Sequence, residues 1–143
     1  METAPHYPCK GGIDRLTDVT EPSITWFPAA GNGPHPAVLV CPGGGYGILA
    51  WNHEGRDICA MLNQNGFTAF LLKYRCPDRR AAAHADAARA MRLIRAKAEQ
   101  FGILENKVGA IGFSAGAHLA ATISAPADEI PYPPADAVDA KPF

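Results

Sequence analysis

The sequence predicts an α/β fold of three layers, in which helices cover both faces of a mostly parallel β-sheet. Short, continuously apolar runs alternate with helical patterns from residue 37 to residue 125. These runs lack the polar alternation of a strand with one face in water, so burial on both faces is expected. The length of 143 residues, with 48% hydrophobic and 19% charged residues, fits one globular domain over 1–143.

The N-terminal segment, residues 1–36, is rich in Pro and Gly and is predicted to be irregular apart from one strand. That strand is Ser23–Phe27, which has the β-branched and aromatic residues typical of a sheet. The run Ala37–Cys41 then predicts the first parallel strand, which the Gly-rich Pro42–Gly47 ends sharply.

A helix over His53–Asn65 comes next, closed by Gly66, and an apolar strand over Phe67–Tyr74 follows it. A long Ala-rich helix then runs to Gly102. One apolar stripe at spacings of three and four predicts its buried face: Ala83, Ala87, Ala90, Met91, Ile94, Ala98 and Phe101. Four basic residues are predicted to take the remaining faces: Arg89, Arg92, Arg95 and Lys97.

The third parallel strand is predicted within residues 106–113, as a buried strand. A helix of small residues starts at Ala115 and runs to about Ser124. The Pro-rich tail, residues 126–143, is interpreted as loop. The order from residue 37 is therefore βαβαβα, which specifies parallel strands joined by helical crossovers.

Composition excludes several classes of protein. The formal net charge is −1, from 13 Lys+Arg and 14 Asp+Glu, so no basic surplus indicates nucleic acid or anionic lipid as a partner. No apolar run reaches the roughly 18 to 20 residues of a membrane span, and no secretory signal is visible. Four widely spaced cysteines show no zinc spacing, and we expect them to be reduced in a cytoplasmic protein without metal or cofactor: Cys9, Cys41, Cys59 and Cys76.

Gly112-Phe113-Ser114-Ala115-Gly116 fits the pattern G-x-S-x-G in the context that the motif requires, between an apolar strand and a helix. A serine in so tight a turn adopts strained dihedral angles, and a Cβ two residues to either side would collide with neighbouring backbone. Glycine at both positions removes the collision and exposes the hydroxyl. The helix N-terminus directs unpaired N–H groups to the same point. We therefore interpret Ser114 as a nucleophile rather than as part of an ordinary strand-to-helix turn.

The Gly-rich loop Pro42–Gly45 leaves the first parallel strand, where enzymes with this motif keep half of their oxyanion hole. A rival interpretation is a dinucleotide loop, because residues 45–50 formally fit G-x-G-x-x-A. No acidic residue ends the next strand, however, where Lys73 and Arg75 stand instead. The rival therefore lacks its ribose-binding carboxylate.

These motifs resemble one known family. Pro42-Gly43-Gly44-Gly45-Tyr46, then His53-Glu54-Gly55, then residues 112–120 look like the acetyl-esterase/acetylxylan-esterase-like branch of the α/β-hydrolases, related to the hormone-sensitive-lipase-like esterases. The resemblance covers residues 20–143. It implies Ser114 as nucleophile, with Gly44, Gly45 and Ala115 as backbone donors to the oxyanion. It also implies short acyl esters as substrates, often acetyl groups on plant polysaccharides.

The catalytic base is not identifiable. In this fold the triad runs Ser, then Asp or Glu, then His along the chain, and only His118 follows Ser114. The resemblance implies that His118 packs between helix and sheet, and His53 is interpreted as a cap neighbour; a role as substitute base is the alternative for each. His84 is interpreted as a solvated helix residue. Asp86 is interpreted as a structural hydrogen-bond partner. The acids after Ser114 lie in the Pro-rich tail, where nothing fixes their geometry: Asp128, Asp136 and Asp139.

The chain therefore resembles the front half of a hydrolase, ending after the nucleophile helix. We expect a serine carboxylic-ester hydrolase that acts through an acyl-enzyme on Ser114. The alternative is a non-catalytic remnant that binds acyl or sugar ligands at the Gly loop, or a fragment of a larger hydrolase. The strand over Val108–Phe113 should be left with an open, apolar edge. Such an edge favours a homo-oligomer built through it, or a complex with a second polypeptide that carries the rest of the fold.

Overall fold

The computed structural model describes residues 12–125 and 131–143, and its core is a four-stranded mixed sheet. The spatial order is β2-β5-β3-β6, with these bounds: β2 Ser23–Phe27, β5 Thr68–Lys73, β3 His35–Cys41 and β6 Ile103–Gly112. β3 pairs in parallel with both β5 and β6, whereas β2 pairs antiparallel with β5. The predicted α/β fold with a mostly parallel sheet is confirmed.

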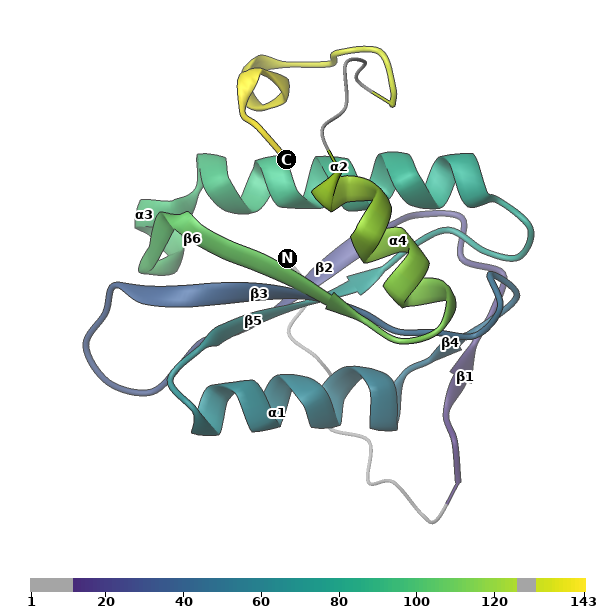
Figure 1. Cartoon of the computed structure of the whole chain (residues 1–143), viewed down its shortest axis with the longest axis horizontal. Helices are drawn as coiled ribbons and strands as arrows, with labels where there is room; N and C mark the ends of the chain where they lie inside the picture. Colours follow the sequence, from purple (N-terminus) through teal and green to yellow (C-terminus); the bar gives the residue numbers. More distant parts are fainter. Residues whose placement is uncertain (1–11, 126–130) are drawn as a thin grey trace.

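Helices cover both faces of this sheet, as predicted. Figure 1 shows α1 (Asp57–Gln64) below the sheet and α2 (Arg80–Ala96) above it, together with α4 (Ala115–Ser124). A short helix, α3 (Ala98–Phe101), follows α2. Each helix comes directly before or after one of the parallel strands, so the layers follow from the alternation in the sequence.

The strands β3 and β5 are buried on both faces because their side chains alternate between two hydrophobic clusters. Leu39 and Phe70 point to the cluster beneath α2 and α4, and Val40 and Leu71 point to the cluster above α1. All four side chains are 0% exposed. This period of two explains why neither strand shows polar alternation in the sequence.

The first helix does not begin as an α-helix. Residues Asn52–Arg56 form a π-helical turn, η1, which runs directly into α1. Before it, β4 (Leu49–Ala50) pairs with β1 (Arg15–Leu16) in a small antiparallel sheet. The buried Gly55 lies against Leu71, where an added Cβ would be 3.2 Å from the nearest side-chain atom.

The Ala-rich helix is interrupted at Lys97, which separates α2 from α3. The whole predicted stripe is buried, and Gly102 ends α3 in the left-handed conformation with φ +64°. Arg92 lies off the apolar stripe, as predicted, but its side chain is buried with 4% exposure. The stripe alone could not show this, since Arg92 is covered by residues of the C-terminal segment.

That segment, residues 131–143, is an ordered layer on α2 rather than a loose loop. Figure 1 shows it on the side of α2 that faces away from the sheet. It contains a 3₁₀ turn, η2 (Ala137–Ala140), capped by Asp136. Arg92 donates to the Lys141 carbonyl at 2.8 Å and to the Tyr132 hydroxyl at 2.9 Å, and its guanidinium lies 4.5 Å from the Phe143 ring centre.

The strand β6 is the open edge of the sheet within the described residues, where it pairs only with β3. The predicted open edge is therefore present, but the expectation that residues 106–113 are buried is wrong. Within β6 only Ile103 is buried, because nothing described covers the outer edge. Arg95 donates to the carbonyls of Glu105 and Val108 at 2.6 and 3.3 Å, which satisfies two backbone acceptors of this strand.

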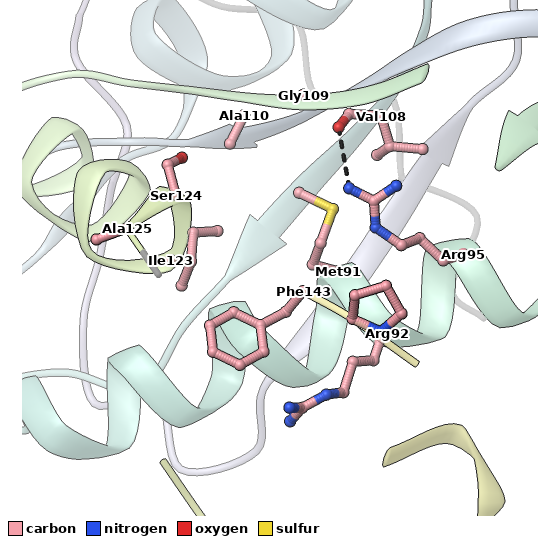
Figure 2. Close-up of a pocket in the computed structure, with 11 residues that line it drawn as sticks. Met91, Arg92, Arg95, Val108, Gly109, Ala110, Ile123, Ser124, Ala125 and Phe143 are labelled. Carbon is pink, nitrogen blue, oxygen red and sulfur yellow. Dashed lines mark hydrogen bonds between the residues drawn. The ribbon is translucent and has the colours of Figure 1, made fainter. Parts of the chain in front are cut away.

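A cavity of about 500 Å³ lies between α2, β6, the end of α4 and the C-terminal segment. Figure 2 shows Met91, Ile123 and Phe143 around this space, with Arg95 bonded to the Val108 carbonyl. It adjoins Ser124 and Ala125, at the opposite end of α4 from Ser114.

Candidate active site

Ser114 occupies the tight turn between β6 and α4, where it is the N-cap residue of the helix. Its backbone has φ +51° and ψ −116°, a region that residues with a side chain rarely adopt. The residue is exposed. The strained, solvent-facing serine that the G-x-S-x-G pattern predicts is therefore present.

The two glycines of the motif are required by close backbone approach. A Cβ on Gly112 would lie 2.0 Å from the Gly116 carbonyl oxygen, and a Cβ on Gly116 would lie 2.0 Å from the Cys41 carbonyl oxygen. Neither neighbour is a flexible side chain that could move aside. The predicted collision is confirmed at both positions, and it packs the turn directly onto the end of β3.

The Gly-rich loop leaves β3 beside this turn. Gly44 and Gly45 have φ of +143° and +63°, and a Cβ on Gly44 would lie 2.0 Å from the Ile48 carbonyl oxygen. The Gly44 carbonyl accepts hydrogen bonds from the N–H groups of Gly47 and Ile48 at 3.0 and 3.1 Å. The chain then enters β4, not a helix, so the dinucleotide interpretation also lacks the helix that it needs.

Three backbone N–H groups of the loop and the turn remain available. Within the described parts of the chain, those of Gly44, Gly45 and Ala115 donate no hydrogen bond. The two segments adjoin, because the Phe113 carbonyl oxygen lies 2.3 Å from where a Cβ of Gly43 would be. Unpaired donors on both sides of an exposed serine are suited to stabilise an oxyanion.

Tyr46 continues the loop with φ +61°, and the residue is 5% exposed. Its hydroxyl lies 2.7 Å from Nδ1 of His118, which links the loop to the first turn of α4. The Arg80 guanidinium lies 5.1 Å from the Tyr46 ring centre. His118 is therefore an exposed partner of the loop, and its interpretation as a residue packed between helix and sheet is wrong.

Among the described residues, the side chains of the other histidines make no hydrogen bond to Ser114. Nδ1 of His53 lies 3.2 Å from the Asn52 side-chain oxygen, which fits the polar neighbour of a helix start. His84 is not a solvated residue as predicted, because its Nε2 is buried without a partner among the described residues. Burial lowers the pKa of His84, and the nearby His118 lowers it further.

The acids have structural partners. Asp86 accepts from the Arg75 backbone N–H at 2.9 Å and from its guanidinium at 2.7 Å, as predicted. The geometry of Asp136 and Asp139 is fixed, contrary to expectation, because Arg89 bonds them at 2.8 and 2.9 Å. Asp128 lies outside the described residues.

Glu54 contacts the loop directly, and sequence reasoning gave it no role. Its Oε2 accepts a hydrogen bond from the Gly43 N–H at 2.9 Å. The sequence feature that could have indicated this contact is the His53-Glu54-Gly55 motif, which stands at the start of the predicted helix that follows the Gly-rich loop.

The described residues contain no group of three or more His, Cys, Asp or Glu side chains that could hold a metal ion. Among the helices of that same portion, none is both long and apolar enough to cross a membrane. Burial raises the pKa of the Cys41 and Cys59 thiols to about 12, so both are poor nucleophiles at neutral pH.

Comparison with known proteins agrees with this geometry. The model of the BD-FAE family matches residues 25–130, which includes the loop, the π-helical turn and the serine turn. An acetylxylan esterase from Xylanibacter ruminicola is 39% identical over 89 residues, which are 62% of this chain and 18% of that protein. An endo-1,4-β-xylanase B from Butyrivibrio fibrisolvens is 33% identical over 99 residues, or 65% of this chain and 15% of that protein.

Solved structures show the same fold. An acetyl ester-xyloside bifunctional hydrolase from Caldicellulosiruptor lactoaceticus matches with a TM-score of 0.68 and 31% identity, over 80% of this chain and 48% of that one. MGS-M1, an α/β hydrolase from a Medee basin deep-sea metagenome library, matches with a TM-score of 0.70 and 26% identity, over 82% and 52%. The chain thus spans about half the length of these structures and under a fifth of the curated relatives.

Proposed function

The chain belongs to the BD-FAE family, and from that membership we propose that it carries the nucleophile and oxyanion donors of a serine carboxylic-ester hydrolase. The observation that carries the proposal is the strained, exposed Ser114, with unpaired N–H groups of Gly44, Gly45 and Ala115 beside it. The names of two similar proteins, an acetylxylan esterase and an acetyl ester-xyloside bifunctional hydrolase, support the same reaction class.

In the proposed reaction the Ser114 hydroxyl oxygen attacks the acyl carbonyl carbon of an ester. The hydroxyl proton passes to a general base, and the carbonyl oxygen becomes an oxyanion that the three N–H groups stabilise. Collapse of this intermediate breaks the bond to the alcohol oxygen, which leaves with a proton. Water then attacks the acyl-serine, releases the acid and restores Ser114. No base is assigned, because no described histidine side chain is bonded to Ser114; His118 bonds the Ser114 carbonyl only through its backbone N–H.

The proposed substrates are short acyl esters, including acetyl esters of polysaccharides. The supporting facts are the names of two relatives, an acetylxylan esterase and an endo-xylanase, together with the short loop that borders the serine. A small acyl group fits best where the donors lie on backbone without large side chains between them, as in Gly44-Gly45.

Pre-steady-state acylation tests the proposal. Mixing the chain with p-nitrophenyl acetate should release a burst of p-nitrophenol equal to the protein concentration, with an acetyl mass on the peptide that contains Ser114. The Ser114→Ala variant should show no burst, and Ser124→Ala serves as the control that keeps it, since Ser124 only bonds the Ala120 carbonyl at the end of α4. Acetyl-ligand binding without a burst in the wild-type chain would favour the non-catalytic alternative.

We also propose that the chain assembles as a homo-oligomer through β6. The support is the open edge of β6, whose residues around Val108 are only partly covered. Multi-angle light scattering should give a mass above that of one chain. Ala110→Pro should reduce that mass by blocking pairing at the open edge, because the Phe113 N–H bonds to Cys41 of β3 and alternate residues of β6 therefore face away from β3. A single-chain mass at high concentration would contradict the proposal.

A cytoplasmic location is proposed as well, supported by three free, buried cysteines among the described residues: Cys41, Cys59 and Cys76. Fractionation of the native host, followed by detection of this chain, tests the location.

A further inference from the structure

Glu54 lies in the π-helical turn η1, close in space to the Gly-rich loop but eleven residues later in the chain than its partner Gly43. Its Oε2 accepts the Gly43 N–H at 2.9 Å, and its side chain is 25% exposed. A hydrogen bond from a backbone N–H to a carboxylate is stronger than one between neutral groups. The contact therefore fixes the first peptide of the loop.

Gly43 is held from three directions. Glu54 takes its N–H, and its carbonyl accepts the Ala50 N–H at 2.9 Å. On the third side its Cα faces the Phe113 carbonyl oxygen, 2.3 Å from where a Cβ would be. Gly43 is thus the point where the loop, the serine turn and β4 meet, and the peptides that follow it carry the unpaired N–H groups of Gly44 and Gly45.

The wide turn of η1 explains how Glu54 reaches this point. The N–H groups of Arg56 and Asp57 bond to the carbonyls of Trp51 and Asn52, five residues earlier, so the turn is wider than an α-helical one. Such turns often occur at functional sites. Gly55 packs against the Leu71 side chain, where an added Cβ would be only 3.2 Å from the nearest atom, so this turn lies close to the sheet.

We propose that Glu54 is a positioning residue for the oxyanion hole, an inference that rests on the proposed function. Its carboxylate binds the Gly43 N–H and thereby orients the next two peptides, so that the N–H groups of Gly44 and Gly45 point toward the acyl oxygen at Ser114. Glu54 does not touch the substrate. Glu54 acts as a fixed hydrogen-bond acceptor, and a negative charge that did not reach the Gly43 N–H would not orient the loop.

Three substitutions separate an acceptor from a charge. Glu54→Gln keeps an oxygen at the same reach but loses the charge, Glu54→Asp keeps the charge but is one methylene too short, and Glu54→Ala loses both. Glu99→Ala, an exposed glutamate on α3, is the matched control. The readouts are the acylation rate with p-nitrophenyl acetate and the melting temperature.

We expect Glu54→Ala and Glu54→Asp to slow acylation about 10- to 100-fold, below the roughly 10²- to 10³-fold for outright loss of one oxyanion donor. Glu54→Gln should stay within a few-fold of wild type, as should Glu99→Ala. If Glu54→Ala fails to fold, the acylation rates of Glu54→Asp and Glu54→Gln are compared instead, and a slower rate in Glu54→Asp supports the proposal. Unchanged acylation in Glu54→Asp, or equal losses in Asp and Gln, would overturn the proposal.

The amide spectrum separates this inference from the proposed function. In a ¹H–¹⁵N correlation spectrum, the amide resonances of Gly43, Gly44 and Gly45 should shift in Glu54→Asp but much less in Glu54→Gln. This measurement needs no turnover. Absence of Ser114-dependent acylation in the wild type would refute the hydrolase, whereas unshifted glycine amides in Glu54→Asp would refute the role of Glu54.

Discussion

At Ser114 the chain is held by contacts between backbones, whereas residues 131–143 are held on α2 by contacts between side chains. Around the serine, the nearest neighbours of Gly112, Gly116 and Gly43 are carbonyl oxygens within 2.0 to 2.3 Å of any added Cβ. On α2, by contrast, Arg89 reaches Asp136 and Asp139, and Arg92 reaches Tyr132 and Lys141.

The two kinds of packing differ in what they tolerate. Backbone contacts leave no room for any side chain, so a single methyl group disrupts the serine turn. Side-chain contacts on α2 can be removed one at a time, and each loss weakens the docking of the segment without changing the path of β6 or α4. Substitutions in the two regions should therefore have different consequences for stability and for acylation.

The largest effect is expected for Gly116→Ala. Its Cβ would lie 2.0 Å from the Cys41 carbonyl oxygen, so the turn must shift away from β3. We expect a loss of about 3 kcal/mol or more in the free energy of unfolding, together with loss of acylation. Chemical denaturation and the p-nitrophenyl acetate burst measure both.

The matched control is Gly109→Ala, in the exposed part of β6, where an added Cβ would meet nothing within 4 Å. This variant should stay within about 0.5 kcal/mol of wild type. Equal stability of the two variants would mean that the turn can open without cost.

The next effect separates two neighbouring glycines of the loop. Gly44→Ala places a Cβ 2.0 Å from the Ile48 carbonyl oxygen, whereas a Cβ on Gly45 meets nothing within 4 Å. We expect Gly44→Ala to slow acylation about 10²-fold, as for a lost oxyanion donor. Gly45→Ala should lose only about 1 to 2 kcal/mol of stability from its left-handed φ. A slower burst in Gly45→Ala than in Gly44→Ala would show that the close contact at Gly44 does not hold the loop.

Release of the C-terminal segment should leave acylation unchanged. Arg89→Ala removes the ion pairs to Asp136 and Asp139. We expect proteolytic cleavage within residues 131–143 to become at least about tenfold faster, which corresponds to the loss of one charge-assisted hydrogen bond. The exposed Arg79→Ala is the control and should not change cleavage. A drop in the burst rate of Arg89→Ala would show that the two regions are coupled.

The smallest effect concerns pH. Tyr132, then the Ala135 N–H, and also Arg89 hold the pKa of Asp139 well below its usual range. Because the folded pKa lies below the unfolded one, this stabilisation is complete above about pH 4 and is lost as the pH falls further toward the folded pKa. As the pH is lowered below about 4, the melting temperature of the wild-type chain should therefore decrease. The melting temperature of Asp139→Asn should decrease less over the same pH range. Identical profiles for the two proteins would contradict this assignment.

The difference between the regions also explains what the sequence could predict. Gly112, Ser114 and Gly116 lie within five residues, so their pattern already contains the geometry of the turn. The burial of Arg92 depends on Tyr132 and Lys141, about 40 to 50 positions further along, and no local pattern reports such a contact.

The contact between Glu54 and Gly43 falls between these cases. Both residues stand in recognisable motifs, but their meeting depends on a π-helical turn, and the spacing of apolar residues does not distinguish this turn from an α-helical one. Similarly, the apolar content of β6 predicted a strand but not its exposure, because exposure depends on which element lies beside it.

The central position of β3 has a consequence for synthesis of the chain. Ala37 pairs with Thr68 on one side and with Val108 on the other, so both neighbours of β3 leave the ribosome after it. Until then Leu39, Val40 and Cys41, all 0% exposed in the folded chain, have no partners. Parallel pairing at such separation is slow to form, and the nascent strand is an apolar segment of the kind that chaperones protect. β3 supports both halves of the candidate site, and it is the strand of this sheet whose second neighbour is synthesised longest after it.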